Sequence, residues 1–291
     1  MALPSEEVVA ILAPIIVYWV AAGVYTVLGR VLADHRLHSR EEEEVRNLVP
    51  KRVVILTVLL QHALQAAIAF AVFYVSAAVQ LLHISMLATQ VSVQLNSSYY
   101  WTQVKREDRR ASDAGTAGAA APMAVVCCQF VAAMVVLDTW QYGWHRLMHS
   151  SGLLYRHVHS WHHRLVAPYA YGAQYNHPLE GLILDTAGGA LALAVTGMAP
   201  LTAAAFFSFA TLKAVDDHSG VLVPGNPLHL LFRNNTAYHD VHHQVRGGRC
   251  NYAQLFFVAW DRVMGTYVPY EVVRAQHGGL EAVPLKKKKK T

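Results

Sequence analysis

Histidines are concentrated in one part of this chain, and their spacing repeats. Twelve of the seventeen histidines fall between His145 and His243. The pattern His-x3-His occurs at His145 and His149, and His-x2-His-His begins at His159 and again at His239. Residues three and four apart share a helical face, so each cluster directs two or three imidazoles to one place. Neutral imidazole is a ligand of iron, copper and zinc, so the clusters predict a metal site.

The number of these imidazoles indicates more than one metal. The three clusters hold eight imidazoles, which exceeds what one ion can bind, so two metals are expected. A lone histidine is usually a surface or satisfied core residue, and a single His-x3-His arises by chance on many helices. Three clusters in a chain with few charged residues are not explained in that way. The eight are His145, His149, His159, His162, His163, His239, His242 and His243.

The composition is that of an integral membrane protein. The chain has 291 residues, of which 54% are hydrophobic and 15% charged, and its mean hydropathy is +0.25. Soluble domains average about 25% charged residues, and this chain has long apolar runs instead. The net charge of +5 does not indicate nucleic-acid binding, because the lysine run 286–290 alone supplies five positive charges. Cys127 and Cys128 are adjacent in an apolar run, so no disulfide framework is expected.

Three apolar runs that could span a membrane precede or lead into the first histidine pair. They cover residues 8–32, 53–82 and 123–137. Glu6 and Glu7 stand where a secretory signal would carry positive charge, so the first run is expected to be a retained span. The fold class is therefore predicted to be all-α, with integral membrane helices.

Polar side chains inside these runs allow two interpretations. Gln61, His62 and Gln65 share one helical face, where hydrogen bonds between helices are expected rather than metal ligation. Asp138 precedes His145 by seven residues and so lies near the same face of a helix. Its carboxylate could orient an imidazole, or it could be a plain interfacial aspartate.

The run 182–212 determines the expected topology. As one straight helix it would be about 46 Å long, well beyond the roughly 30 Å of a bilayer core. It would also place the second and third histidine clusters on opposite sides of the membrane. The segment Gly197-Met-Ala-Pro200 can break it. We therefore predict a helical hairpin that brings all the histidines to one face, within a catalytic region 123–270 that follows a membrane region 1–122 and precedes a tail 271–291.

Together these motifs resemble the fatty acid hydroxylase (sterol desaturase) superfamily, over roughly residues 137–267. Within it, the stretch 164–178 looks most like the plant-type sphinganine C4-monooxygenases. The matching motifs are Asp138-Thr-Trp-Gln-Tyr with the first histidine pair, the run 154–163, Asn176-His-Pro-Leu-Glu180, Asp217-His-Ser-Gly220 and the run 238–243.

The resemblance implies a di-iron membrane oxygenase of the endoplasmic reticulum. It would use O2 and electrons passed from NAD(P)H by cytochrome b5 and its reductase. The implied reaction is C4-hydroxylation of a sphinganine-type long-chain base, free or in ceramide. The eight clustered histidines carry over as ligands, and His177 and His218 are implied as further ones, which gives about five for each of two metals.

Four carboxylates near these motifs are candidate site residues. Asp217 and Asp240 adjoin ligands, so each could orient an imidazole or simply cap a helix end. Glu180 and Asp185 lie near the expected mouth of the hairpin. A carboxylate there could pair with the ammonium of a long-chain base, since a charge near the membrane needs a partner. Alternatively, Glu180 could orient His177.

Other functions remain open at this point. A C-4 sterol methyl oxidase, or another sterol or fatty acid hydroxylase of the superfamily, would share the same metal site. A non-catalytic metal transporter or sensor is a rival of another class. A transporter should hold its ligands within the spans near the bilayer midplane, whereas these histidines follow the spans.

The C-terminal sequence bears on location. Lys288 and Lys289 stand fourth and third from the end, which resembles the dilysine retrieval signal of endoplasmic reticulum membrane proteins. Such a signal is cytosolic. Together with the hairpin, it predicts that the histidines face the cytosol.

Overall fold

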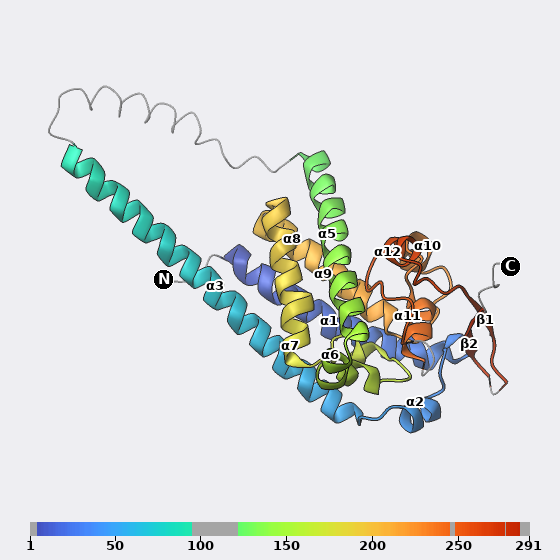
Figure 1. Ribbon diagram of the computed structural model, residues 1–291. Coiled ribbons are helices and arrows are strands. Elements are labelled where there is room, and N and C mark those ends of the chain that lie inside the picture. The colour runs from blue at the N-terminus through green and yellow to red at the C-terminus, as the bar shows by residue number, and fades with distance from the viewer. Residues whose placement is uncertain (1–4, 95–121, 245–247, 277, 286–291) are drawn as a thin grey trace.

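The computed structural model describes residues 5–94, 122–244, 248–276 and 278–285, with only the backbone described for Ser5 and residues 76–94. Helices make up most of the fold, which confirms the predicted all-α class (Figure 1). The α-helices are α1 Ser5–Val31, α2 Arg40–Arg46, α3 Lys51–Gln94, α5 Met123–Ser150, α6 Gly152–His157, α7 Pro178–Gly181, α8 Gly188–Thr196, α9 Pro200–Asp217, α10 Pro227–Leu231, α11 Thr236–His243 and α12 Ala259–Val263. The other elements are the 3-10 helices η1 Ala33–His35, η2 His159–Arg164 and η3 Ala170–Gly172, the π-helix η4 Leu182–Ala187, and the strands β1 Tyr270–Arg274 and β2 Leu280–Pro284.

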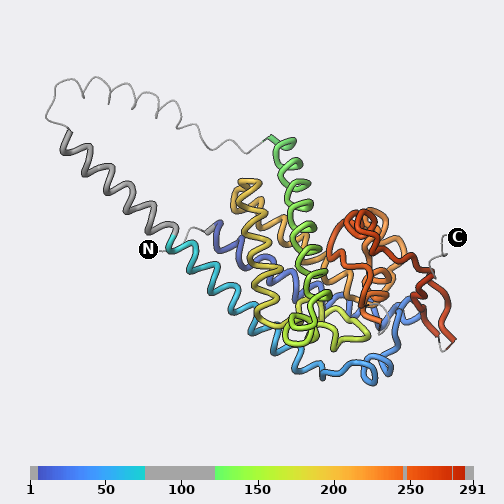
Figure 2. Tube along the Cα trace, in the orientation of Figure 1, coloured from blue at the N-terminus to red at the C-terminus, as the bar shows by residue number. Residues whose placement is uncertain are grey.

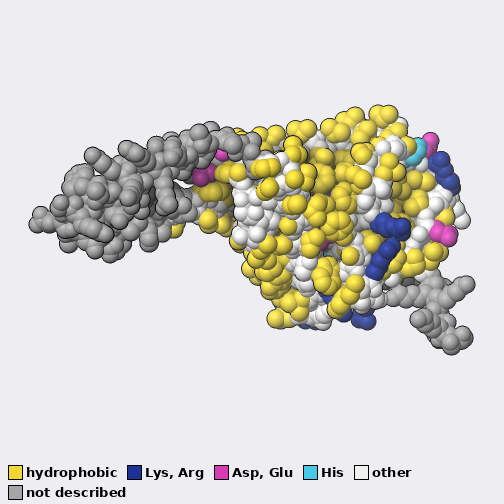
Figure 3. Space-filling view, turned by 90° about the horizontal axis from the view of Figure 1, so that it is seen from above, with side chains coloured by type: hydrophobic (Ala, Val, Ile, Leu, Met, Phe, Trp, Pro, Cys, Tyr) yellow, Lys and Arg dark blue, Asp and Glu magenta, His cyan; other side chains and the backbone are white. Residues whose placement is uncertain are grey.

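Four described helical segments are long and apolar enough to cross a membrane. They are Glu6–Val31, Lys51–Val75, Met123–Ser150 and Pro178–Thr196. Apolar side chains on their outer faces, such as Val20 and Leu60, are more than half exposed, as lipid contact would require and water would disfavour. Seen from above, hydrophobic side chains cover most of the described surface (Figure 3). The chain is therefore a multi-pass membrane protein.

The predicted hairpin is present, and its arms diverge. Helix α8 ends at Gly197, whose φ of 60° is the left-handed conformation that glycine adopts at little cost, and Pro200 begins α9. The chain then turns back towards the histidines (Figure 2). The two arms have different partners, since α8 packs along α5 and α9 packs along α1. This reversal brings His218, just after α9, back to the side on which the hairpin began.

Two of the three polar residues on α3, His62 and Gln65, make the expected contacts, whereas the buried side chain of Gln61 has no hydrogen-bond partner among the described residues. His62 lies between Trp19, whose Nε1 donates to it at 3.2 Å, and the side chain of Gln174 at 2.5 Å. Gln65 donates to the carbonyl of Gly181 at 3.3 Å. These contacts tie α1, α3 and the segment before α7 together, which places α3 beside the histidine region.

The segment expected to be a tail contains a β-hairpin. Its strands pair antiparallel, with Val272 opposite Ala282. Ala282 is buried against Val241 of α11, so the hairpin belongs to the folded body. At its turn, Gly279 has a φ of 79°, and a Cβ there would lie 2.8 Å from the carbonyl oxygen of Arg36. The lysine run at 286–290, with the dilysine-type signal, lies outside the described residues.

Candidate metal centre

Nine of the ten predicted histidine ligands meet in two groups. Within each group the ligand nitrogens all lie within 4.8 Å of one another. Group A contains His145, His149, His159, His163 and His242, and group B contains His162, His218, His239 and His243. The division is thus five and four, rather than the expected five and five. Group B is wholly buried, whereas His149 and His163 of group A are partly exposed.

Each group draws on several elements. Helix α5 directs His145 and His149 to group A from successive turns, because residues four apart share a face. Asn235 caps α11 by accepting hydrogen bonds from two backbone amides, which fixes where its three histidines begin. His218 comes from the C-terminal cap of α9. The site therefore depends on helices that are distant in sequence.

The two groups are interleaved along the chain. His162 belongs to group B and His163 to group A, although they are consecutive on η2. Likewise, on α11, His242 belongs to group A and His243 to group B. Consecutive residues point about 120° apart on a 3-10 helix and about 100° apart on an α-helix, so one His-His pair can face two ions. Each His-x2-His-His motif therefore contributes to both groups.

Backbone carbonyls set the tautomer of most of these rings. His145 Nδ1 lies 2.7 Å from the carbonyl oxygen of Tyr252, and His242 Nδ1 lies 2.7 Å from that of Cys250. A carbonyl only accepts, so Nδ1 must carry the proton, and the lone pair is then on Nε2. The same contact is made by His162 to Tyr175, His218 to Ala214 and His243 to Leu165. Such outer hydrogen bonds are usual for metal-binding imidazoles.

The Nε2 atoms converge at distances that suit bound ions. In group A, His149 Nε2 lies 2.9 Å from that of His159 and 3.0 Å from that of His163. In group B, the Nε2 atoms of His239 and His243 are 2.9 Å apart. Two nitrogens each about 2.1 Å from one ion, at right angles, would lie about 3.0 Å apart. Lone pairs facing each other at this distance repel unless a cation lies between them, so the donor set fits one metal per group.

Burial keeps these rings neutral, as metal binding requires. It lowers the pKa of His162 to about 4, even though the nearby Glu180 acts in the opposite direction. It also lowers the pKa of His242 to about 3. Burial, and then the neighbouring His162, lower the pKa of His218 to about 3. At neutral pH these imidazoles are therefore uncharged and ready to bind a cation.

His177 lies outside both groups. Its Nδ1 accepts a hydrogen bond from the backbone amide of Leu179 at 3.2 Å, so it caps α7. Its ring packs against Trp161, with ring centroids 4.9 Å apart. The motif resemblance could not distinguish this capping role from ligation, because both place a histidine at the same position of the motif and only the fold shows that His177 lies away from the two groups.

The two aspartates next to ligands have other partners. Asp217 forms a buried ion pair with Lys213. Asp240 lies 2.5 Å from Nε2 of His38, so it ties the connection between α1 and α2 to α11. Among the described residues, neither carboxylate is hydrogen-bonded to a histidine of group A or group B, because Asp217 pairs with a lysine of its own helix and Asp240 pairs with a histidine of another segment.

Two other carboxylates support the site. Glu180 Oε1 lies 2.7 Å from His159 Nδ1, so this glutamate orients a group A ligand instead of His177. Asp138 accepts hydrogen bonds from the backbone amides of Phe256 and Phe257, at 3.1 and 2.6 Å. It thus holds the loop whose Tyr252 carbonyl positions His145, and it acts on that imidazole only indirectly.

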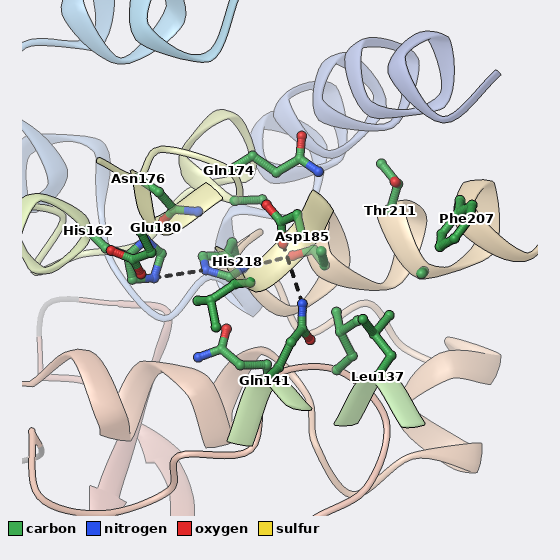
Figure 4. A pocket seen from close by; sticks show the side chains of 16 residues that line it. Leu137, Gln141, His162, Gln174, Asn176, Glu180, Asp185, Phe207, Thr211 and His218 are labelled. Carbon is green, nitrogen blue, oxygen red and sulfur yellow. Dashed lines mark hydrogen bonds between the residues drawn. The ribbon is translucent and has the colours of Figure 1, made fainter. Parts of the chain in front are cut away.

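A cavity of about 100 Å³ adjoins group B (Figure 4). His162 and His218 form part of its wall, and apolar side chains such as Leu137 and Phe207 form another part. The polar residues in the wall are Gln141, Gln174, Asn176, Glu180, Asp185, Thr211 and Gln254. A molecule in this cavity would have a polar end held close to a metal group, so it is a candidate substrate site.

Several known proteins are similar to this chain over nearly its whole length. Sphinganine C4-monooxygenase 1 of Arabidopsis thaliana is 47% identical over 97% of this chain and 95% of its own. Sphingolipid C4-hydroxylase of Schizosaccharomyces pombe is 38% identical over 90% and 88%. A very-long-chain aldehyde decarbonylase of Oryza sativa is 46% identical over 97% and 96%. These relatives of similar length are therefore named for two different activities, C4-hydroxylation and aldehyde decarbonylation.

The remaining comparisons identify the family to which the chain belongs. Methylsterol monooxygenase 1 of Rattus norvegicus matches only 47% of the chain, at 39% identity. No solved structure matches. The sequence model described as Fatty acid hydroxylase matches residues 130–266, which include every histidine of groups A and B. From this match and from the full-length relatives, the chain belongs to the fatty acid hydroxylase family, together with the sphinganine C4-monooxygenases.

Proposed function

We propose that this protein is a di-iron monooxygenase that hydroxylates C4 of sphinganine-type long-chain bases. The observation that carries the proposal is the position of a polar-ended cavity directly against group B, in which four buried imidazoles share one site. The names of the Arabidopsis and fission yeast relatives support the same substrate class.

The donor set suits iron. Imidazole is a good ligand for iron, and with five and four imidazoles the groups leave room for oxygen at the less crowded ion. Two bound irons would supply the activation of O2 that no side chain can provide. The residues of this chain orient the imidazoles through Nδ1, hold the substrate beside group B and exclude water from it. A non-catalytic metal-binding role would not require the adjoining cavity.

The polarity of the cavity separates the candidate substrates. A long-chain base has an amine and two hydroxyls next to its alkyl chain, which can satisfy Gln141, Asp185 and Asn176 in the wall. A long-chain aldehyde or a sterol would leave most of these buried groups without partners, and a site built for hydrogen bonds rejects such ligands strongly. The aldehyde decarbonylase and sterol methyl oxidase activities are therefore disfavoured.

The partners and location follow from the same proposal. Hydroxylation consumes electrons, and the partly exposed His149 and His163 make group A the side on which a donor such as cytochrome b5, reduced by its reductase from NAD(P)H, would dock. The apolar helices support a multi-pass membrane protein, and its location in the endoplasmic reticulum membrane with this face towards the cytosol is part of the proposal.

Expression in a yeast strain that lacks its own C4-hydroxylase tests the proposal. Trihydroxy long-chain bases should appear with the wild-type chain and be absent with His162→Ala, measured by mass spectrometry of hydrolysed lipids. Shortened hydrocarbons or oxidised sterols in place of trihydroxy bases would contradict the proposal and favour one of the other two activities.

A further inference from the structure

Three buried oxygen atoms in the cavity beside group B lack a hydrogen-bond partner among the described residues. They are Oε1 of Gln141, Oδ2 of Asp185 and Oε2 of Glu180. Gln141 is 6% exposed and Glu180 only 1%. An unsatisfied buried polar atom costs about 1–3 kcal/mol, and native structures keep few of them. Three in one cavity therefore indicate a ligand that satisfies them.

All three atoms accept hydrogen bonds, so the missing ligand must be rich in donors. The opposite end of each side chain is already engaged. Glu180 holds His159 through Oε1, and the Gln141 amide nitrogen donates to Asp185 Oδ1 at 3.4 Å (Figure 4). These contacts fix the direction of the unpaired oxygens before any ligand arrives.

The backbone around Asp185 and the charges of the cavity wall also indicate a ligand site. Asp185 lies in the π-helix 182–187, a rare backbone form that occurs mostly at functional sites. Two carboxylates share the cavity wall, and Lys and Arg are absent from the residues that line it. A cationic ligand would therefore meet two carboxylates and no positively charged side chain in this wall.

On the basis of the proposed function, we infer that Gln141, Asp185 and Glu180 form a subsite for the protonated aminodiol of a free long-chain base, and that ceramide is excluded. The ammonium and the two hydroxyls of a free base supply five donor hydrogens and one positive charge. In a ceramide the nitrogen is a neutral amide with one donor and a second long chain.

The same subsite determines which carbon reacts. His162 and His218 line the cavity that contains the three acceptors, so a bound head group lies directly beside group B. C4 is the first methylene after the hydroxyl-bearing C3. Anchoring the aminodiol therefore places C4 nearer the metal group than the methylenes further along the chain.

Binding and turnover of matched ligands test the inference. The ligands are sphinganine, N-acetylsphinganine and octadecylamine, the last of which has the charge without the hydroxyls. Dissociation constants are measured on the metal-loaded full-length protein in detergent with no reductant present, and products formed after reductant is added are identified by mass spectrometry. The variants are Asp185→Asn and Gln141→Met. Gln129→Met is the control, since Gln129 is on the same helix but bonds only to the turn at Thr196 and Gly197.

Wild-type protein should bind sphinganine at least about tenfold more tightly than either of the other ligands. Asp185→Asn should weaken sphinganine binding by about tenfold or more, since a buried charge loses its partner. Gln141→Met should weaken it several-fold and release some product oxidised beyond C4. Gln129→Met should bind as the wild type does. Two metals retained per chain would show that each variant is folded.

Two different results would overturn the inference. Equal binding or turnover of N-acetylsphinganine by the wild type would contradict the exclusion of ceramide. Unchanged sphinganine binding in both cavity variants, with normal C4 product, would show that these residues do not form the subsite, but it would not contradict the proposed function. If the wild type binds sphinganine but forms no C4 product, the proposed function fails, and with it the claim about which carbon reacts.

Discussion

Glu180 and His159 form a buried carboxylate–imidazole pair, with 2.7 Å between Oε1 and Nδ1. The pair links group A to the cavity beside group B, because Glu180 also lines that cavity and its second carboxylate oxygen has no hydrogen-bond partner among the described residues. One side chain thus orients a group A ligand and faces the space in which a substrate would bind beside group B.

Removing this carboxylate should weaken metal binding. Glu180→Leu leaves the His159 Nδ1 proton without its acceptor, and loss of such an outer hydrogen bond typically costs 10–100-fold in metal affinity. Glu180→Gln keeps an acceptor and should cost less. Competition with a chelator, read by metal analysis, measures the difference. Equal affinity in the wild type and Glu180→Leu would show that the pair does not support group A.

Loss of a ligand in either group should abolish turnover. His162→Ala removes a group B ligand and His163→Ala a group A ligand, and residues that act as a unit lose activity together. We expect each variant to lose more than about 100-fold in rate and to retain at most about one metal per chain, against two in the wild type.

Two histidines outside the groups provide controls for this experiment. His157 is exposed and His177 caps α7, so His157→Ala and His177→Ala should both keep two metals. Loss of one metal in His177→Ala would show that His177 is a tenth ligand. Full activity in His162→Ala, or one metal per chain in fully active enzyme, would contradict the two-metal site.

Acid should destabilise the metal-free protein. The folded-state pKa values of His162, His218 and His242, about 4, 3 and 3, lie below the ordinary 6.5 because the rings are buried. Below about pH 6.5 the unfolded chain binds protons that the folded chain does not. Stability is therefore full above that pH and is lost as the pH falls, by about 1.4 kcal/mol per proton and pH unit.

His38 has the opposite effect on how stability changes with pH. Burial is the largest single effect on His38 and lowers its pKa, but the hydrogen bond to Asp240 and the negative charges of Asp240 and Glu42 together outweigh burial, so the folded pKa is raised. Its stabilisation is present below 6.5 and is lost as the pH rises through the folded pKa. The buried ligands outnumber it, so the midpoint of thermal unfolding should be lower at pH 5.5 than at pH 7.5. An unchanged or higher midpoint at pH 5.5 would show that the ligands are not buried as neutral rings.

The turn of the hairpin should tolerate no branched side chain. Gly197→Val forces a β-branched residue into the left-handed conformation, at a cost of about 1–2 kcal/mol or more. Gly143→Ala is the matched control, since a Cβ there meets nothing within 4 Å and alanine favours a helix. The midpoint temperature of thermal unfolding should therefore be lower than that of the wild type for Gly197→Val, and equal to it or higher for Gly143→Ala. The reverse order would mean that Gly197 does not hold this turn.

Much of the site could be predicted because metal ligation needs particular residue types at particular spacings. The three histidine clusters identified eight of the nine histidines that meet in groups A and B, and Gly197 with Pro200 identified the turn that brings them together. The assignment of ligands to each ion could not be predicted, because it depends on η2 being a 3-10 helix. His177 was placed with the ligands because a motif does not reveal which ring caps a helix.

Other features depend on contacts between distant parts of the chain. The Nδ1 acceptors of the ligands are mostly backbone carbonyls, such as that of Leu165 for His243, and carbonyls have no residue signature. The partner of Glu180 depends on where α7 packs against η2. The β-hairpin at 270–284 did leave a signal, since the valine-rich run at 272–273 is followed by Gly278 and Gly279, which suit a tight turn.

The alternation of neighbouring histidines between the two groups couples their occupancy. An ion in group A fixes His163 and His242, and their neighbours His162 and His243 are then already in place for group B. The first ion therefore bears most of the entropy cost of ordering η2 and α11, and the second binds to a preorganised site. Metal uptake should be cooperative, with little singly loaded protein at any metal concentration. For the same reason, neither ion site could decay by mutation while the other persisted unchanged.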